Sequence, residues 1–293
     1  MYLVDFIYDG LRLSNYGCMV GNVVNSGDAA ISMGSVVEFE TAINHGTYTS
    51  EIINADYPDV YTVTFDIFKK NCGSGHKDYF EDKEITWFMR WLNRKDYHKF
   101  VPIYDNAEEF YRLFYMGTFN ECKAISIQGK VYGFSLTFIS NSPFAYLDYK
   151  PNTFKITNLN QSVKIKGEYK VPCGSFAFYD TSEELGAVYP KSFKITINDS
   201  GKGDFLLMND MDPSGRYTEI KSCSQGEVIN FDCIHKVITS NNQTAHDKFY
   251  NDFNYVFPRL VNTFDKSLNT FYATRRCTIT IDYNPIRKVG VIT

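Results

Sequence analysis

The chain has 293 residues, of which 44% are apolar and 22% charged, and it contains 24 Phe and 22 Tyr. This length predicts about two domains, and the many aromatic residues exclude a mostly disordered chain. A net charge of −4 argues against a protein that grips nucleic-acid backbones, because such proteins carry a basic surplus. The longest apolar stretches fall well short of the roughly 18–20 residues that a membrane span needs, so we expect no membrane insertion.

Seven cysteines are widely spaced along the chain, and none forms a CxxC pair. The start, Met-Tyr-Leu-Val-Asp-Phe, has no basic segment ahead of an apolar one, so we expect no signal peptide. An odd cysteine count without an export signal predicts reduced, mostly buried thiols in a protein made in a cytoplasm.

The earliest clear pattern lies at residues 60–68, where Tyr61, Val63, Phe65 and Ile67 alternate with other residues. A period of two predicts a strand with these four side chains on one face. Aromatic and β-branched residues suit such a half-buried pleated surface, and they are frequent throughout the chain.

An amphipathic pattern predicts a helix that opens near Asp82, which is the expected N-cap. Ile85, Phe88, Met89 and Leu92 recur at i, i+3, i+4 and i+7 and form one apolar stripe. Basic residues follow towards the C-terminal end, where they suit the helix dipole. We interpret them as a solvated helix face rather than a nucleic-acid site.

Two alternating segments, residues 125–127 and 131–138, flank the turn residues Gln128-Gly129-Lys130. A glycine-containing turn between alternating segments predicts a β-hairpin. Residues 194–198 and 277–283 repeat the alternation in the second half. This density of short strands predicts a mainly β protein with sandwich-like sheets.

The best candidate domain boundary is the turn-rich stretch at residues 141–153, which contains Asn141-Ser142-Pro143 and later Pro151-Asn152. The charge balance also changes there. Residues 1–147 hold 12 Lys/Arg and 18 Asp/Glu, a net −6, whereas residues 148–293 hold 18 and 16, a net +2. We therefore predict one domain over residues 1–147 and another over 148–293.

No local motif indicates catalysis. The five histidines are scattered without HxH or HExxH spacing, and there is no GxSxG elbow. Residues 73–77 lack the full phosphate-loop pattern and are interpreted as a connection. Residues 199–204 and 210–215 are interpreted as turns, because the latter lacks the remaining calcium-loop ligands. We expect no enzyme, and we assign no catalytic, cofactor-binding or metal residues.

Four stretches in the first half of the chain form a pattern of an opening strand and turn, a strand that precedes the helix, the helix centre and a closing strand. These stretches are Phe6-Ile7-Tyr8-Asp9-Gly10 with Ser14-Asn15-Tyr16-Gly17, Phe65-Asp66-Ile67-Phe68-Lys69, Arg90-Trp91-Leu92, and Gly133-Phe134-Ser135-Leu136-Thr137-Phe138 with Ser142-Pro143-Phe144-Ala145-Tyr146. In these stretches the chain resembles the distal tail proteins of siphophages and of related phages or prophages of Gram-positive hosts.

The second half is similar to the same family in three stretches. They are Gly226-Glu227-Val228-Ile229-Asn230-Phe231-Asp232, Phe253-Asn254 with Phe257-Pro258-Arg259-Leu260 and Leu268-Asn269, and Ile279-Thr280-Ile281-Asp282-Tyr283-Asn284-Pro285. One departure is Ser267, which stands where the family commonly has Gly. Each stretch is weak alone, but their order and spacing extend over nearly the whole chain.

The resemblance implies a mainly β protein with an N-terminal belt domain, of sandwich-like sheets and one helix, and a C-terminal galectin-like β-sandwich. It implies a structural protein of the virion tail tip, assembled in the host bacterial cytoplasm as a hexameric ring. That ring would join the tail tube to the tail-associated fibre or lysin protein, and would also meet the tape measure and receptor-binding proteins. DNA would pass through without specific binding.

A second interpretation is a carbohydrate-binding β-sandwich that contacts host surface glycans, although fold alone does not confer that function. Sugar sites usually combine an aromatic platform with polar groups. The two tryptophans, Trp87 and Trp91, both lie in the predicted helix, so tyrosines would have to serve instead. Trp87 and Trp91 share a helix face. They either pack in the core or anchor a subunit contact.

The acidic surplus of residues 1–147 suggests a ring lumen lined by carboxylates, which would repel DNA phosphates. The alternative is that these acids merely solvate the outer surface. The candidates for lumen-facing acids are Glu38, Glu40, Glu51, Asp56 and Asp59.

Overall fold

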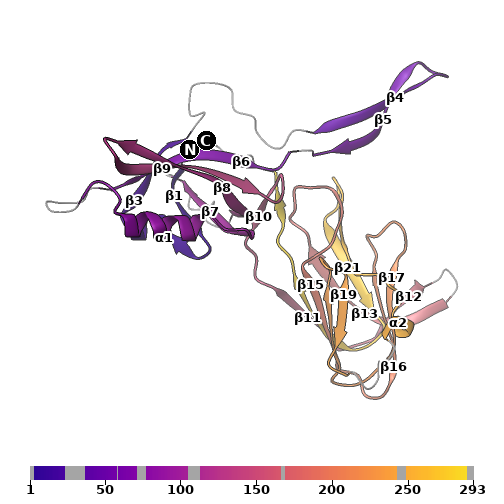
Figure 1. Ribbon diagram of the computed structural model, residues 1–293. Coiled ribbons are helices and arrows are strands. Elements are labelled where there is room, and N and C mark those ends of the chain that lie inside the picture. The colour runs from indigo at the N-terminus through magenta and orange to yellow at the C-terminus, as the bar shows by residue number, and fades with distance from the viewer. Residues whose placement is uncertain are drawn as a thin grey trace. The chain divides into compact units, whose positions relative to one another are not determined.

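The computed structural model describes most of the chain, and strands dominate it, so the predicted mainly β fold is confirmed (Figure 1). The described residues are 3–23, 37–57, 59–70, 77–104, 113–165, 169–242 and 249–288. Cys72 and most of the connection at residues 73–77 lie outside these ranges. No helix among the described residues is both long and apolar enough to cross a membrane.

The chain divides into two compact units. The first comprises Met1–Asp148 together with Arg287–Thr293, and the second comprises Tyr149–Ile286. The chain returns to the first unit because its last strand, β23 (Ile286–Arg287), pairs with β10 (Ala145–Leu147). The predicted second domain, residues 148–293, includes these final residues, because a two-residue strand has no pattern that a sequence can reveal.

The first unit is built on a nine-stranded sheet with the order β2-β1-β7-β8-β9-β6-β3, to which β10 and β23 attach. Its remaining strands are β1 (Leu3–Tyr8), β2 (Leu11–Arg12), β3 (Cys18–Val23), β6 (Thr62–Lys69), β7 (His98–Tyr104), β8 (Leu113–Ile127) and β9 (Lys130–Ser140). The predicted turn joins β8 to β9, with Gln128 and Gly129 at φ 50° and 77°. These left-handed conformations suit a two-residue hairpin loop.

Aromatic side chains form most of the first unit's core. Phe6 is fully buried, and its ring lies 5.5–5.9 Å from the rings of Phe65, Trp91, Phe100 and Phe119. The five residues come from four strands of the sheet, β1, β6, β7 and β8, and from one helix. Tilted and edge-to-face ring pairs of this kind add to the free energy gained by burial.

The helix α1 (Asp82–Leu92) supplies the predicted apolar stripe, and Phe88, Trp91 and Leu92 are buried in the sheet's core. The predicted N-cap is wrong by one residue. Glu81 caps the helix, and its backbone N–H donates to the Glu84 carboxylate at 2.8 Å. Such a reciprocal capping box satisfies helix N–H groups that have no partner inside the helix. A 3-10 helix, Leu13–Tyr16, also belongs to this unit.

The second unit consists of two five-stranded sheets around one core, with the orders β11-β22-β15-β18-β19 and β12-β13-β21-β16-β17. A short extra ribbon pairs β14 with β20. The elements are β11 (Asn152–Ile156), β12 (Gln161–Ile165), β13 (Tyr169–Tyr179), β14 (Gly186–Val188), β15 (Ser192–Ile197), β16 (Gly203–Asn209), β17 (Tyr217–Cys223), β18 (Val228–Asp232), β19 (Val237–Ser240), α2 (Phe249–Asp252), β20 (Leu260–Asn262), β21 (Leu268–Ala273) and β22 (Cys277–Asp282).

The predicted alternation is confirmed on both sides of the boundary. In β6, Val63, Phe65 and Ile67 are buried while the residues between them are at least partly exposed. Strands β15 and β22 follow the same rule, with Phe193 and Ile279 among their fully buried residues. A period of two is informative here because each sheet has one face against a core. The turns predicted at residues 199–204 and 210–215 join β15 to β16 and β16 to β17.

We expect Phe6→Ala to destabilise the first unit by about 3–5 kcal/mol, because it leaves a large cavity among packed rings. Denaturant unfolding followed by tryptophan fluorescence measures this unit alone, since Trp87 and Trp91 are the only tryptophans. Ile127→Ala is the control, because Ile127 is exposed at the β8–β9 turn. Its expected effect is within about 0.5 kcal/mol. Equal midpoints for the two variants would contradict this account of the core.

We expect a fragment of residues 149–286 to fold alone, because its two sheets share a core of their own. Circular dichroism should show a cooperative thermal transition. A soluble fragment with strand signal but no cooperative transition would mean that this unit depends on the rest of the chain.

Candidate functional site

The most exposed element of the first unit is a two-stranded ribbon made of β4 (Glu38–Asn44) and β5 (Thr49–Asp56) (Figure 1). The two strands pair only with each other, and each of their residues is exposed. Tyr48 closes the turn at φ 55°, and its N–H donates to the carbonyl of Asn44 at 2.7 Å. An isolated hairpin is at best marginally stable in water, so this ribbon is expected to need a covering surface.

The strand register gives the ribbon one acidic face. On this face Glu38 lies opposite Asp56, and Glu40 follows two positions along β4. Glu51 of β5 lies on the same face, opposite Ala42. Residues 37–57 contain no Lys or Arg, so no cation within the ribbon offsets these four carboxylates. Like charges directly opposite each other destabilise a strand pair. This face is therefore expected to remain in water or to meet cations from elsewhere.

The opposite face of the ribbon is apolar. It carries Phe39, Ile43 and Ile52, which are 58%, 61% and 61% exposed. Ile53 is an extra residue in β5, because the register shifts between Glu40 and Thr41, and it is also exposed. Contiguous exposed apolar side chains of this kind mark interaction surfaces.

Four of the five acids proposed for a lumen thus share one face of this ribbon. The fifth, Asp59, is exposed just beyond the end of β5 and belongs to no strand. The sequence carries only a short signal for the ribbon, because acidic and apolar residues alternate at Glu38, Phe39 and Glu40. Neither the pairing of β4 with β5 nor its bulge follows from that alternation alone.

The two tryptophans have different environments. Trp91 is 2% exposed, and its indole N–H donates to the carbonyl of Tyr8 at 3.1 Å. Its role is therefore core packing, and it is not available on the surface of this chain. Trp87 is partly buried, with its ring 4.3 Å from that of Tyr16, which is 38% exposed. Of the pair, only Trp87 remains a candidate for a subunit contact.

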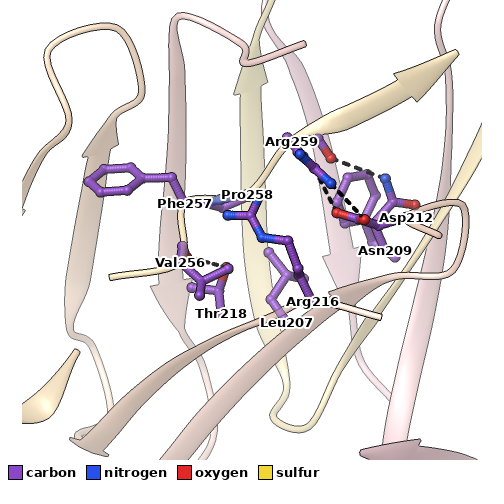
Figure 2. Close-up of a pocket in the computed structure, with 10 residues that line it drawn as sticks. Leu207, Asn209, Asp212, Arg216, Thr218, Val256, Phe257, Pro258 and Arg259 are labelled. Atoms are coloured by element: carbon purple, nitrogen blue, oxygen red, sulfur yellow. Dashed lines mark hydrogen bonds and ion pairs between the residues drawn. The ribbon is translucent and has the colours of Figure 1, made fainter. Parts of the chain in front are cut away.

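The second unit contains a small cavity beside a buried ion pair. Figure 2 shows Arg259 forming two parallel hydrogen bonds to Asp212, at 2.7 and 2.8 Å. The carbonyl of Arg259 accepts from the amide of Asn209, which also donates to Asn269. The cavity holds about 10 Å³, enough for roughly one water. This arrangement fixes three chain segments together and leaves no room for a larger ligand.

The environment of Asp212 sets its charge. Burial raises the pKa of this carboxyl, but hydrogen bonds from Arg259 and Ser214 oppose burial and bring the pKa down to about 2. Asp212 was assigned above to a turn, and its carboxylate is occupied by an arginine. In the described part of the chain, no three His, Cys, Asp or Glu residues lie close enough to hold a metal ion.

The cysteines are free thiols at all six described positions, and five of the six are buried. Burial raises the pKa of Cys18, Cys223, Cys233 and Cys277 to about 12 and that of Cys122 to about 11. A thiol with so high a pKa is a poor nucleophile, because the thiolate is the reactive form. The prediction that most of the cysteines are buried is confirmed at five of the six described positions.

Comparison with known protein families gives two matches. A model described as a phage tail protein N-terminal domain matches residues 1–142, and one described as a phage tail C-terminal domain matches residues 159–283. The chain belongs to this family of phage tail proteins. No protein of curated function matches it in sequence.

Comparison with solved structures shows which known proteins have a fold similar to that of this phage tail protein. The crystal structure of the Dit protein (gp 19.1) of phage SPP1, described as a paradigm of the hub adsorption apparatus in phages that infect Gram-positive bacteria, matches with a TM-score of 0.63. The match covers 98% of this chain and 100% of that one at 13% identity. A chain of the phage P2 baseplate in its activated conformation with Ca gives a TM-score of 0.44 at 12% identity, over 100% of both chains. The predicted membership of a phage tail protein family is confirmed by the two family models, and the fold is similar to that of the SPP1 Dit protein.

We expect Arg259→Leu to destabilise the second unit by about 3 kcal/mol at pH 7, because it leaves the Asp212 carboxylate buried without its cation. The folded-state pKa of Asp212 is depressed, so the pair stabilises the protein above about pH 4 and stops doing so as pH falls towards 2. The difference between wild type and Arg259→Leu should shrink over that interval in urea unfolding followed by circular dichroism.

The matched control is Arg216→Leu, because Arg216 lines the same cavity but, among the described residues, its side chain bonds to the Tyr189 hydroxyl at 3.4 Å and to no carboxylate. It should cost under about 1 kcal/mol and show no such pH dependence. A constant Arg259→Leu penalty from pH 7 to pH 2 would refute the assigned role of Asp212.

Proposed function

We propose that this phage tail protein is a structural subunit of the tail tip that assembles into a ring, most simply of six copies. The ring would connect the tail tube to the tail-associated fibre or lysin protein, and the tape measure and receptor-binding proteins would also contact it. Assembly in the host cytoplasm would agree with the free, buried thiols. The observation that carries the proposal is the exposed amphipathic ribbon β4–β5.

The apolar face of the ribbon supports assembly through a second copy of this chain. Burying Phe39, Ile43 and Ile52 would contribute about 1.5–3 kcal/mol per side chain. A ribbon that leaves its own unit and lies on the next copy makes a head-to-tail contact, which closes into a ring when the rotation permits. The family match and the similarity of fold to a hub protein of phage SPP1 favour the same assembly.

The acidic face of the ribbon supports a role beside passing DNA. Glu38, Glu40, Glu51 and Asp56 would repeat in every copy, so a ring that turns this face inward would present many carboxylates and no cation from the ribbon. Such a wall repels phosphates and would let DNA pass without being held. We propose no enzymatic activity, since the described residues include no cluster that could hold a metal ion and the pKa values of their thiols are raised by burial.

We expect Ile43→Asp with Ile52→Asp to abolish ring assembly, because each change places a charge in the proposed subunit contact. Light scattering should give about 34 kDa for this variant and a multiple of it for the wild type, with the tube protein added if assembly requires it. The melting temperature should barely change, because neither residue is packed in a core.

The control for this experiment is Ile127→Asp, a change of the same kind at another exposed hairpin turn. It should assemble normally. Identical mass distributions for the double variant and the wild type would exclude the ribbon as the assembly element.

We expect Glu40→Lys with Glu51→Lys to make the assembled ring bind duplex DNA, with an affinity that falls steeply as salt rises. The wild-type ring should bind weakly at every salt concentration in a filter-binding assay. Glu183→Lys with Asp210→Lys makes the same change of net charge on exposed residues of the second unit. If that control gains as much DNA binding as the ribbon variant, the acidic face has no special place beside the channel.

A further inference from the structure

A second, larger pocket lies within the second unit, between the segment that follows β13 and the turn that joins β20 to β21. Its volume is about 470 Å³, within the range of about 300–1,000 Å³ for small-ligand sites. Its lining includes Tyr179, Asp180, Ser182, Asn262, Phe264 and Asp265. Neither the proposed ring nor the ribbon uses this pocket.

The floor of the pocket is held by hydrogen bonds between distant segments. The Tyr283 hydroxyl contacts the Ser182 hydroxyl and donates to the Asp180 carboxylate, while the Asp180 N–H donates to the carbonyl of Ser267 at 2.9 Å. The amide of Asn262 donates to the carbonyls of Ser182 and Glu184, at 2.6 and 3.1 Å. The pocket is therefore pre-formed, which lowers the entropy cost of binding.

One polar atom on this floor is left without a donor. Both N–H groups of the Asn262 amide are used by the carbonyls of Ser182 and Glu184, so this amide can be placed in one orientation only. Its Oδ1 then accepts no hydrogen bond from any described residue, although the residue is only 4% exposed. This oxygen is not among the fully buried side-chain atoms that lack a partner, so it faces the pocket, where it can accept a hydrogen bond from water or from a ligand.

The rim of the pocket is aromatic and unusually exposed. Phe264 is 90% exposed and Tyr179 63% exposed. Phe264 stands at the tip of a tight turn, where the N–H groups of Thr263 and Lys266 each donate to the other residue's carbonyl, at 2.8 and 3.3 Å. Because the Phe264 ring stays in water, its apolar surface contributes little to folding and is free to meet a ligand. Such a ring can lie against the apolar face of a ligand.

The charges around the pocket favour a neutral ligand. Asp180 and Asp265 supply carboxylates, and Lys266 supplies the one cation among the lining residues. Asp265 and Lys266 are exposed and form no ion pair with any described residue, so both are available for hydrogen bonding. The net negative lining disfavours phosphates and other anions.

We propose that this pocket binds a neutral saccharide. A sugar ring would lie against Phe264 or Tyr179 through its apolar face, one hydroxyl would donate to Asn262 Oδ1, and others would bond Asp265 and Lys266. A peptide from a partner protein presents fewer donors over the same length and matches this floor less well. The proposal is independent of ring assembly, because the pocket lies entirely within the second unit.

The test is saturation-transfer NMR on the full chain with methyl glycosides of glucose, galactose, mannose, N-acetylglucosamine and N-acetylgalactosamine. At least one should receive magnetisation from the protein, and inorganic phosphate should not compete. Phe264→Ala should weaken binding roughly tenfold, through loss of the ring contact. Because Phe264 is not packed in a core, this variant should melt at the wild-type temperature.

The matched control is Ile234→Ala, which removes an exposed apolar side chain elsewhere in the same unit. It should bind the glycoside as the wild type does. Failure of every glycoside to bind at millimolar concentration would overturn the proposal. So would equal binding by Phe264→Ala and the wild type, or loss of binding to another tail protein, instead of to a sugar, in Phe264→Ala.

Discussion

The sheets of this protein have apolar faces that must be shielded from water. The architecture follows from which element packs over each face. In the first unit, helix α1 and a cluster of phenylalanines cover the nine-stranded sheet. In the second unit, two five-stranded sheets cover each other. The ribbon β4–β5 has no such cover among the described residues. Exposed apolar surface is costly in water, which is why we propose that ribbon as the assembly contact.

The two faces of the ribbon suit different neighbours, and this division links the fold to the proposed ring. Phe39, Ile43 and Ile52 would gain free energy on leaving water, whereas the four carboxylates on the other face would lose hydration if buried without partners. A contact with the next copy through the apolar face leaves the acidic face in water. Assembly and a lumen that does not hold DNA would then arise from one element.

The second unit contains two polar clusters that leave very different amounts of space around them. At Asp212 and Arg259, a buried ion pair fills the space between segments and leaves room for about one water. At Asn262 and Ser182, buried polar groups hold two loops open around a much larger pocket. The two clusters differ in whether all of their hydrogen-bonding groups have partners within the protein. The first set is satisfied within the protein, whereas the second leaves an amide oxygen to be satisfied from outside.

The sequence by itself determined the mainly β class, the apolar faces of β6, β15 and β22, the turn between β8 and β9, and the stripe of α1. These features follow from side-chain periods of 2 and 3.6, which act over a few neighbouring residues. The order of short family-like stretches also indicated a tail protein, which the family match confirms.

Only the tertiary structure decided which distant residues meet. It placed Trp91 in the core, returned β23 to the first unit, gathered four acids on one face of a ribbon, and paired Asp212 with Arg259 across 47 positions. The pocket around Asn262 likewise depends on contacts with Ser182, 80 positions away. Local periodicity carries no information on such pairs, because strand order and loop packing bring them together.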